Sequence, residues 1–413
     1  MNGVYVRRVL ATLLGALALL LAGCSEAGDR RGGEPGDERA SRSKAAGAGA
    51  ASRGAGKGVD PPRIPSAEGL PGWAHSLGFA ADGSGFVLLA QCPEGEEEGT
   101  GDGCVQRVAV LDKGARQWRV AKASPLANTA PDWGVTADVL VLGPGRALIR
   151  EGRSAIGDRT WYTADSGRTW RKGTTAVQGT VPSVPAHGRL VSVCSAEDAE
   201  GNGCGRARLA VIMPDSGEHR ALAQQPPLDG VVDPAGEAAG DLYVQGKAPG
   251  SGRPTLAVSS DQGRSWSKSP LPGAATAQHG TFTLVSGRAG VFALQRGGLP
   301  EGEGVKNGLL TIHKQNASDR TWTRVWAFRP GVEPRSVLGA VAADDNSLTV
   351  YGEHGVWTSE TGGRTFHQGE GSTGVAGSAW ETPIGWLWES STGQGAYRIS
   401  SDGVHWHTFQ LSD

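Results

Sequence analysis

Apolar positions beyond residue 63 occur in short runs, and glycine, proline and aspartate separate one run from the next. Each run has the length of a β-strand, and no stretch shows a sustained helical period. The 65 glycines strengthen this pattern, because glycine permits tight turns and disfavours long helices. The sequence therefore predicts an all-β body. Representative runs are 85–89, 139–142, 189–193, 241–244, 290–294 and 347–351.

A longer apolar run lies near the N-terminus, where residues 9–20 follow Arg7 and Arg8. Positive charge before a short apolar stretch is typical of an export signal, and the stretch is shorter than an ordinary membrane span. The run ends in Leu-Ala-Gly before Cys24, which resembles the lipobox of bacterial lipoproteins. The resemblance implies that residues 1–24 are a lipoprotein signal peptide. Lipid on Cys24 would anchor the protein to the cell membrane, facing the extracytoplasmic side. A plain signal peptide with a coincidental cysteine is the alternative, and the two arginines leave Sec and twin-arginine export open.

Residues 25–62 consist almost entirely of small, polar and charged residues. Such a segment buries too little apolar surface to offset its chain entropy, so we expect a disordered linker. As a flexible coil it would reach roughly 30–35 Å on average. The predicted organisation is a tether over residues 25–62 and a folded body over residues 63–413.

The body contains an internal repeat with the pattern S/T-x-D-x-G-x-x-W. The two best copies begin at Thr163 and Ser259, and looser copies begin at Ser359 and Ser400. Three weaker copies keep the spacing, so that seven units follow one another at intervals of 40 to 56 residues. Regular units of this length are the signature of repeat architectures, including propellers. Seven units are the best count, with six or eight as alternatives.

This pattern resembles the Asp box, also called the bacterial neuraminidase repeat. The aspartate accepts backbone N–H groups inside a turn, the glycine adopts a conformation that a Cβ would oppose, and the aromatic residue packs between blades. The resemblance implies a seven-bladed β-propeller of four antiparallel strands per blade. It also places the boxes between the third and fourth strands, away from the binding face, as folding elements. The residues matched are Thr163, Asp165, Gly167, Trp170, Ser259, Asp261, Gly263, Trp266, Ser359, Gly363, Phe366, Ser400, Asp402 and Trp406.

The end of the chain bears on how such a ring would close. The last unit has its own outer strand, over residues 405–411. We therefore expect either closure without a swapped strand or an extra strand from residues 63–75.

Four cysteines remain after Cys24, in two close pairs. An even number in an exported chain indicates disulfides, so we expect Cys92 to pair with Cys104 and Cys194 with Cys204. Each pair would staple an equivalent hairpin, in blades one and three. Both enclosed loops are acidic, and we favour a solvated loop over a calcium site because no EF-hand spacing is present.

The rest of the sequence carries few signs of chemistry. A net charge of −2 gives no indication of a nucleic-acid partner. Phosphate-binding, zinc-protease, redox and hydrolase motifs do not occur, and we expect no cofactor. His405 and His407 could lie on one face of a strand, but no third ligand is evident, so no metal is expected.

The Asp-box resemblance also brings sialidases into consideration. They hold the substrate carboxylate with three arginines, use an aspartate as acid/base, and use a tyrosine nucleophile that a glutamate activates. Arg63-Ile64-Pro65 resembles the Arg-Ile-Pro opening of that family. The other two arginines, the aspartate and the glutamate cannot be assigned to positions of this sequence. Candidate nucleophiles are Tyr162, Tyr243, Tyr351 and Tyr397.

Tryptophans of the last unit bear on a binding role. Trp380, Trp386 and Trp388 suit either sugar stacking or packing between blades, and packing is favoured. The leading hypothesis is therefore a non-catalytic propeller that binds a protein or polysaccharide. An exo-sialidase is the alternative.

Overall fold

The computed structural model describes residues 60–92, 103–126, 137–151, 159–197, 203–276, 280–300, 304–369, 374–391 and 395–412. Cys24, the signal peptide, most of the linker and the acidic loops between the paired cysteines lie outside the described residues. The predictions made for them are therefore not tested. No helix that is long and apolar enough to cross a membrane occurs in the described part of the chain.

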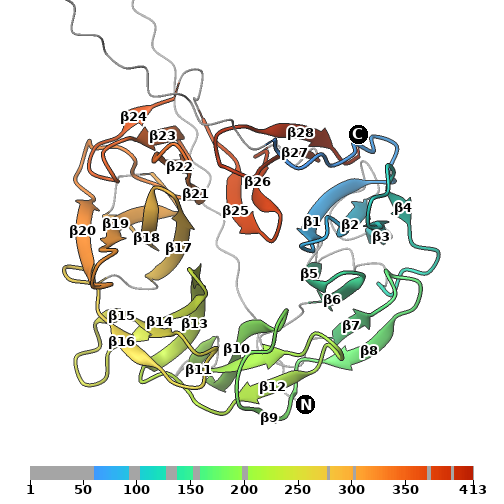
Figure 1. Ribbon diagram of the computed structural model, residues 1–413, viewed down its shortest axis with the longest axis horizontal. Coiled ribbons are helices and arrows are strands. Elements are labelled where there is room, and N and C mark those ends of the chain that lie inside the picture. Colours follow the sequence, from blue (N-terminus) through green and yellow to red (C-terminus); the bar gives the residue numbers. More distant parts are fainter. Residues whose placement is uncertain are drawn as a thin grey trace, which may run out of the picture. The chain divides into compact units, whose positions relative to one another are not determined.

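The described body is a ring of seven four-stranded sheets, and this confirms the predicted seven-bladed β-propeller (Figure 1). The described strands follow one another without an intervening helix. Blades one and two contain β1 (Trp73–Phe79), β2 (Gly85–Gln91), β3 (Val105–Leu111), β4 (Arg119–Val120), β5 (Ala137–Gly143), β6 (Arg146–Glu151), β7 (Arg159–Thr163) and β8 (Arg171–Thr174). Blades three and four contain β9 (Val177–Val181), β10 (Arg189–Glu197), β11 (Cys204–Ile212), β12 (His219–Leu222), β13 (Asp229–Ala238), β14 (Asp241–Lys247), β15 (Pro254–Ser259) and β16 (Ser267–Ser269).

The remaining three blades complete the ring. Blades five and six contain β17 (Thr281–Gly287), β18 (Gly290–Gly297), β19 (Gly308–Gln315), β20 (Trp322–Ala327), β21 (Gly339–Ala342), β22 (Leu348–Gly352), β23 (Gly355–Ser359) and β24 (His367–Gln368). Blade seven contains β25 (Ser378–Thr382), β26 (Gly385–Glu389), β27 (Ala396–Ser400) and β28 (His407–Gln410).

The hydrophobic core lies between the blades. Second strands are covered on both faces, which explains their continuous apolar runs, such as the fully buried stretch from Phe86 to Ala90 in β2. Alternate residues of that strand face opposite neighbours. Phe86 and Leu88 join the cluster shared with blade two, whereas Val87 and Leu89 join the cluster shared with blade seven.

The antiparallel order brings two kinds of turn to the same end of the ring. The turn from the first to the second strand and the repeat turn from the third to the fourth strand both lie at this end, which we call the repeat-turn end. In blade two, Ala147 of β6 pairs with Thr163, the first residue of a repeat turn. First strands of the blades run towards the repeat-turn end, and second strands run away from it.

The third blade departs from this plan. The repeat turn at Asp215 joins β11 to β12, so these are the third and fourth strands by their place in the repeat. Strand β10 then corresponds to a second strand, yet it is the innermost strand of its sheet. The residues that precede it, β9, instead pair in parallel with β12 at the outer edge (Figure 1). Strand β10 therefore holds the inner position of this blade beside β13, where Ser192 Oγ donates to Asp233 at 2.6 Å, and β9 supplies the outer strand.

The ring closes through residues 63–70, which we call the closing strap. The last blade has its own outer strand, β28, as expected, and the strap adds a single parallel bridge outside it. The N–H of Ala67 donates to the Gln410 carbonyl at 2.7 Å, and the N–H of Ser412 donates to the Ala67 carbonyl at 3.0 Å. Ile64 is buried in the cluster between blades seven and one. Closure thus combines features of both predicted alternatives.

Both predicted disulfides are confirmed. Cys92 is bonded to Cys104, and Cys194 is bonded to Cys204. Each joins a second strand to a third strand, at the end of the ring opposite the repeat turns. They are equivalent staples in blades one and three, because β10 and β11 correspond to β2 and β3.

Candidate functional site

A cavity of about 530 Å³ lies in the central channel at the repeat-turn end, and we call it the channel cavity. It is bounded by the first strands of blades four, five and seven and by the start of β10. Its polar and aromatic lining includes Arg189, Glu237, Thr283, Ser286, Trp380 and Glu381. The sequence-based expectation placed the binding face at the opposite end, away from the repeat turns.

Two glutamates approach each other across this cavity. Glu237 is the second-last residue of β13, and Glu381 is the second-last residue of β25. Burial in the channel raises the pKa of Glu381, and the negative charge of Glu237 raises it further. Both side chains stay accessible to solvent, so a bound molecule could reach their carboxylates.

The charged side chains of the cavity are available for a ligand. Arg189, Glu237 and Glu381 form no ion pair or side-chain hydrogen bond with any described residue. Arg189 and Glu237 also line an adjoining cavity of about 240 Å³. A cation and two carboxylates without internal partners can exchange hydrogen bonds with a polar ligand.

Trp380 is the aromatic residue best placed to contact a ligand. Its indole is half-buried, lines the cavity and packs on the cluster between blades seven and one. Trp386 also borders the cavity but is buried in the core between blades, and Trp388 packs on that core with Nε1 donating to the Ala376 carbonyl at 2.9 Å. Interblade packing is thus confirmed for these two tryptophans.

The repeat turns form closed networks of hydrogen bonds. Asp261 accepts from the Ser265 N–H at 2.9 Å and from the Ser265 hydroxyl at 2.6 Å, and Ser259 Oγ accepts from the Gly263 N–H at 2.7 Å. Gly263 has a φ of 85°, which disfavours any side chain. The Ser265 hydroxyl, the Ser265 N–H and the Ser259 hydroxyl lower the pKa of Asp261 to about 2.

The other predicted turns repeat this arrangement. Thr163 and Asp165 bind the turn of Gly167 in the same way. In the Ser359 turn, the hydroxyl of Thr361 replaces the carboxylate and accepts from the Thr365 N–H at 3.0 Å. Their carboxylates and hydroxyls are therefore engaged within the turn.

The last turn, which begins at Ser400, also uses a histidine. Asp402 accepts from the N–H groups of Val404 and His405 at 2.8 Å, and its second oxygen lies 2.7 Å from His405 Nδ1. Burial opposes ionisation of Asp402, but these bonds lower its pKa to about 2. His407 Nε2 lies 3.0 Å from the Ile64 carbonyl of the closing strap. No group of three metal-ligating residues occurs among the described residues.

Aromatic residues at the ends of the repeat turns pack less deeply than expected. Trp170 is half-buried and forms a T-shaped pair with Phe86, and Trp266 is half-buried with Nε1 donating to the Gln224 carbonyl at 3.0 Å. Phe366 and Trp406 are half-buried against the core of blades five to seven. These rings pack against the clusters between blades, as expected, but stay partly exposed.

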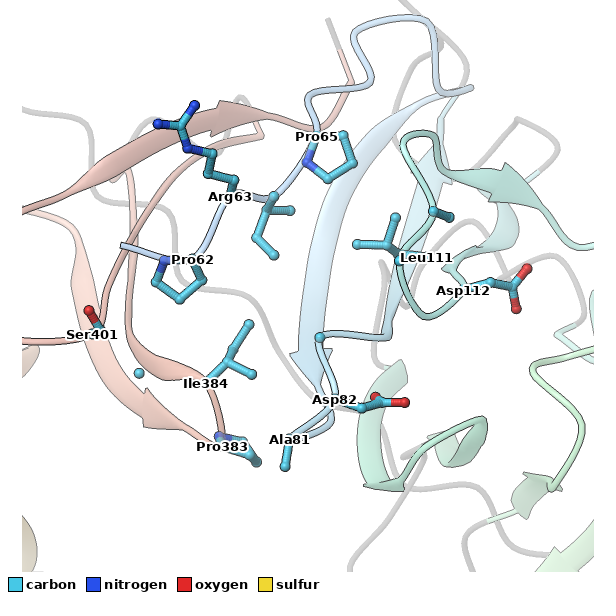
Figure 2. Close-up of a pocket in the computed structure, with 15 residues that line it drawn as sticks. Pro62, Arg63, Pro65, Ala81, Asp82, Leu111, Asp112, Pro383, Ile384 and Ser401 are labelled. Atoms are coloured by element: carbon cyan, nitrogen blue, oxygen red, sulfur yellow. The ribbon is translucent and has the colours of Figure 1, made fainter. Parts of the chain in front are cut away.

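A second cavity of about 630 Å³ lies at the seam between blades seven and one (Figure 2). Its acids have local partners: Asp82 accepts from the Ser84 hydroxyl at 2.6 Å, and Asp112 pairs with Arg119 at 2.7 Å. In Figure 2 the guanidinium of Arg63 points away from the cavity. Pro62, Ile64 and Pro65 also line it, so the Arg-Ile-Pro segment serves ring closure.

Of the four candidate tyrosines, only Tyr243 lines the channel cavity among the described residues, and its buried ring has a hydroxyl that accepts from Gln315 Nε2 at 3.0 Å. Tyr397 donates to Glu389 at 3.2 Å, but the ring is buried and stacks on Phe409, and burial raises the pKa of its phenol. Tyr162 donates to the Pro214 carbonyl at 2.8 Å. Burial also raises the phenol pKa of Tyr243, and that of Tyr351 to about 12. Only one arginine, Arg189, lines this cavity among the described residues.

Glu237 and Glu381 were not identified from the sequence. Both stand one residue before the end of an inner strand, ahead of a two-residue turn, and this position is their only shared signal. Their proximity depends on the closure of the ring across three blades.

No protein-family model matches this chain, and no curated protein matches it. Solved structures with a similar fold include an ulvan lyase, with 11% identity and a TM-score of 0.44, covering 84% of this chain and 96% of that one. An α-L-arabinanase of Penicillium chrysogenum has 10% identity and a TM-score of 0.36, covering 86% and 97%. The propeller domain of the trilobed protease of Pyrococcus furiosus has 8% identity and a TM-score of 0.40, covering 82% and 98%. At these values the likeness carries no conclusion about a ligand or a reaction.

Proposed function

We propose that this protein is a lipid-anchored extracytoplasmic propeller that binds a polysaccharide segment in the channel cavity without chemical turnover. The observation that carries the proposal is the lining of the cavity. It combines a half-buried indole, Trp380, with three charged side chains that have no ion-pair or side-chain hydrogen-bond partner among the described residues, and with the hydroxyls of Thr283 and Ser286. A sugar ring presents an apolar face for stacking and hydroxyls for hydrogen bonds, so it suits this lining.

The charge of the cavity favours a neutral or amino-bearing sugar. Two carboxylates face one guanidinium there, so an acidic sugar would meet net repulsion. This argues for a ligand class different from the sialic acids of the sialidase alternative. The carboxylates would accept hydrogen bonds from sugar hydroxyls, and Arg189 would donate them.

Binding can be tested by isothermal titration of the purified full chain with cellohexaose, chitosan hexamer and sialyllactose as probes. We expect binding of the neutral or the cationic probe and none of the acidic one. Trp380→Ala should weaken that binding by about tenfold or more, because the stacking area is lost. Trp73→Ala is the matched control, since Trp73 is also partly exposed but begins β1 at the opposite end. Equal losses in the two variants would contradict the proposal.

Membrane anchoring rests on Cys24 and is tested separately. Cys24→Ala should abolish metabolic lipid labelling and release the protein from the membrane fraction. Labelling that persists in this variant would refute the anchor.

A second candidate function, glycoside hydrolysis, is favoured by one observation. Glu381 has a raised pKa beside a second carboxylate, and paired carboxyl groups with separated pKa values are the usual acid and base of glycosidases. If the protein is such an enzyme, Glu381→Gln should abolish release of reducing ends from a bound probe and preserve its binding. A pure binding protein should release none in either form.

A further inference from the structure

The channel cavity continues into the adjoining cavity of about 240 Å³. Arg189, Glu237 and Pro383 line both cavities. All three side chains are exposed, so they form a low ridge between the cavities and not a buried wall. The adjoining cavity alone is smaller than the ~300–1,000 Å³ that is usual for a separate ligand site. The two cavities therefore form one groove across the repeat-turn end of the ring.

The adjoining cavity has an apolar floor. Phe79 at the end of β1, Leu142 of β5 and Val184 before β10 line it, and all three are buried. An apolar floor with polar groups around it suits the face of a sugar ring, whose hydroxyls point outwards. The floor thus extends the kind of lining that Trp380 provides in the channel cavity.

The rim of the adjoining cavity carries His187. Its exposed imidazole lines the cavity and has no hydrogen-bond partner among the described residues. Its backbone has a φ of 65°, a conformation that costs energy in residues other than glycine and is often found at functional sites. The turn is held by the N–H of Gly188, which donates to the Pro185 carbonyl at 2.9 Å, and by the N–H of Val184, which donates to the Gln262 carbonyl at 2.8 Å. The imidazole is therefore presented from a fixed backbone.

The ridge between the cavities can contact a ligand from both sides. The guanidinium of Arg189 donates hydrogen bonds, and the carboxylate of Glu237 accepts them. Neither forms an ion pair with a described residue. Consecutive units of a chain that crosses the ridge would each find a donor and an acceptor there.

We propose that the groove binds consecutive units of one oligosaccharide chain. One sugar ring lies on Trp380 in the channel cavity, the chain crosses the ridge, and further units occupy the adjoining cavity under His187. This inference rests on the proposed polysaccharide-binding function and adds to it a second subsite, a dependence on chain length and a specificity residue, His187. The ligand class is thus an extended neutral or amino-bearing chain, and a short sugar fills only part of the groove.

The test is isothermal titration of the purified full chain with chitosan dimer and hexamer and with cellobiose and cellohexaose. In the series that binds, the hexamer should bind about tenfold or more tightly than the dimer, because only the hexamer reaches the second subsite. Trp380→Ala should weaken binding of the dimer and the hexamer alike.

Two variants address the adjoining cavity. Ala186→Trp fills it from an exposed position, and His187→Asn removes the imidazole but keeps a residue that tolerates a positive φ. Each should lower the hexamer's affinity towards that of the dimer and leave the dimer's affinity unchanged. His367→Asn, on the exposed strand β24, is the matched control and should change neither.

Equal affinities of dimer and hexamer for the natural chain would overturn the second subsite, while the proposed binding function would stand. Absence of binding by all four probes would overturn both. An unchanged hexamer affinity in Ala186→Trp would also refute the subsite, because the additional units would then lie elsewhere. An unchanged hexamer affinity in His187→Asn would refute the role of the imidazole.

Discussion

His219 makes the stability of the propeller depend on pH between neutrality and pH 4. This residue begins β12, is 2% exposed, and its Nδ1 has no hydrogen-bond partner among the described residues. Burial, and then the positive charge of Arg150, lowers its pKa to about 4, although a backbone hydrogen bond with Thr174 acts in the opposite sense. The folded protein therefore holds this imidazole neutral in a range where the unfolded chain protonates it.

The sign and size of the effect follow from linkage. The folded pKa lies below the unfolded value of 6.5, so stability is complete above pH 6.5 and declines as the pH falls towards 4. At pH 5 the loss attributable to His219 is about 2 kcal/mol relative to pH 7. His75 has a pKa lowered to about 4 by burial and should add a similar loss.

The substitution His219→Gln isolates the contribution of His219 to the pH dependence of stability, because glutamine is polar but cannot titrate. Urea unfolding at pH 7 and pH 5 measures the difference in free energy for the natural chain and the variant. We expect the variant to lose about 2 kcal/mol less than the natural chain between the two pH values. The control is His367→Gln, on the exposed strand β24. An identical pH dependence of the natural chain and His219→Gln would refute the reasoning, whatever the stability at pH 7.

Three further predictions concern the closing strap, a disulfide and the last repeat turn, and urea unfolding at pH 7 checks each. Ile64→Ala should cost about 2–5 kcal/mol, since it removes a buried side chain from the seam of the ring; a negligible change would mean that the strap does not stabilise closure. Replacing Cys194 and Cys204 together by serine should cost about 2–3 kcal/mol and leave the fold intact, because the bond closes a short loop. Loss of all folded signal would show that the hairpin nucleates the blade. Asp402→Ala should cost about 1–3 kcal/mol, because the N–H groups of Val404 and His405 lose their acceptor. An unchanged midpoint would argue that water replaces the carboxylate fully.

Features set by local chemistry could be predicted from the sequence. The turn at Ser259 needs only residues within a few positions of one another, so its pattern recurs visibly and yields the blade count. The disulfides also join residues close in sequence, within single hairpins. The depth of Trp170 could not be predicted in this way, since it depends on how neighbouring blades tilt.

Features set by long-range pairing could not be predicted. Val177–Val181 has the composition of an inner strand, and only its parallel pairing with β12 places it at the outer edge of the third blade. The candidate site also depends on contacts between residues far apart in the sequence. Glu237 and Glu381 belong to blades four and seven, and no local pattern relates their positions.

The closing strap has a mechanical consequence. It enters the ring from Asp60, beside the last repeat turn, and ends against the strand that finishes the chain. Any load transmitted along the polypeptide from the N-terminal side therefore reaches this seam before any other blade interface. The main-chain bonds at Ala67 and the buried Ile64 would bear it together. Under tension the propeller should thus open at the interface between blades seven and one, while the remaining six interfaces bear no load.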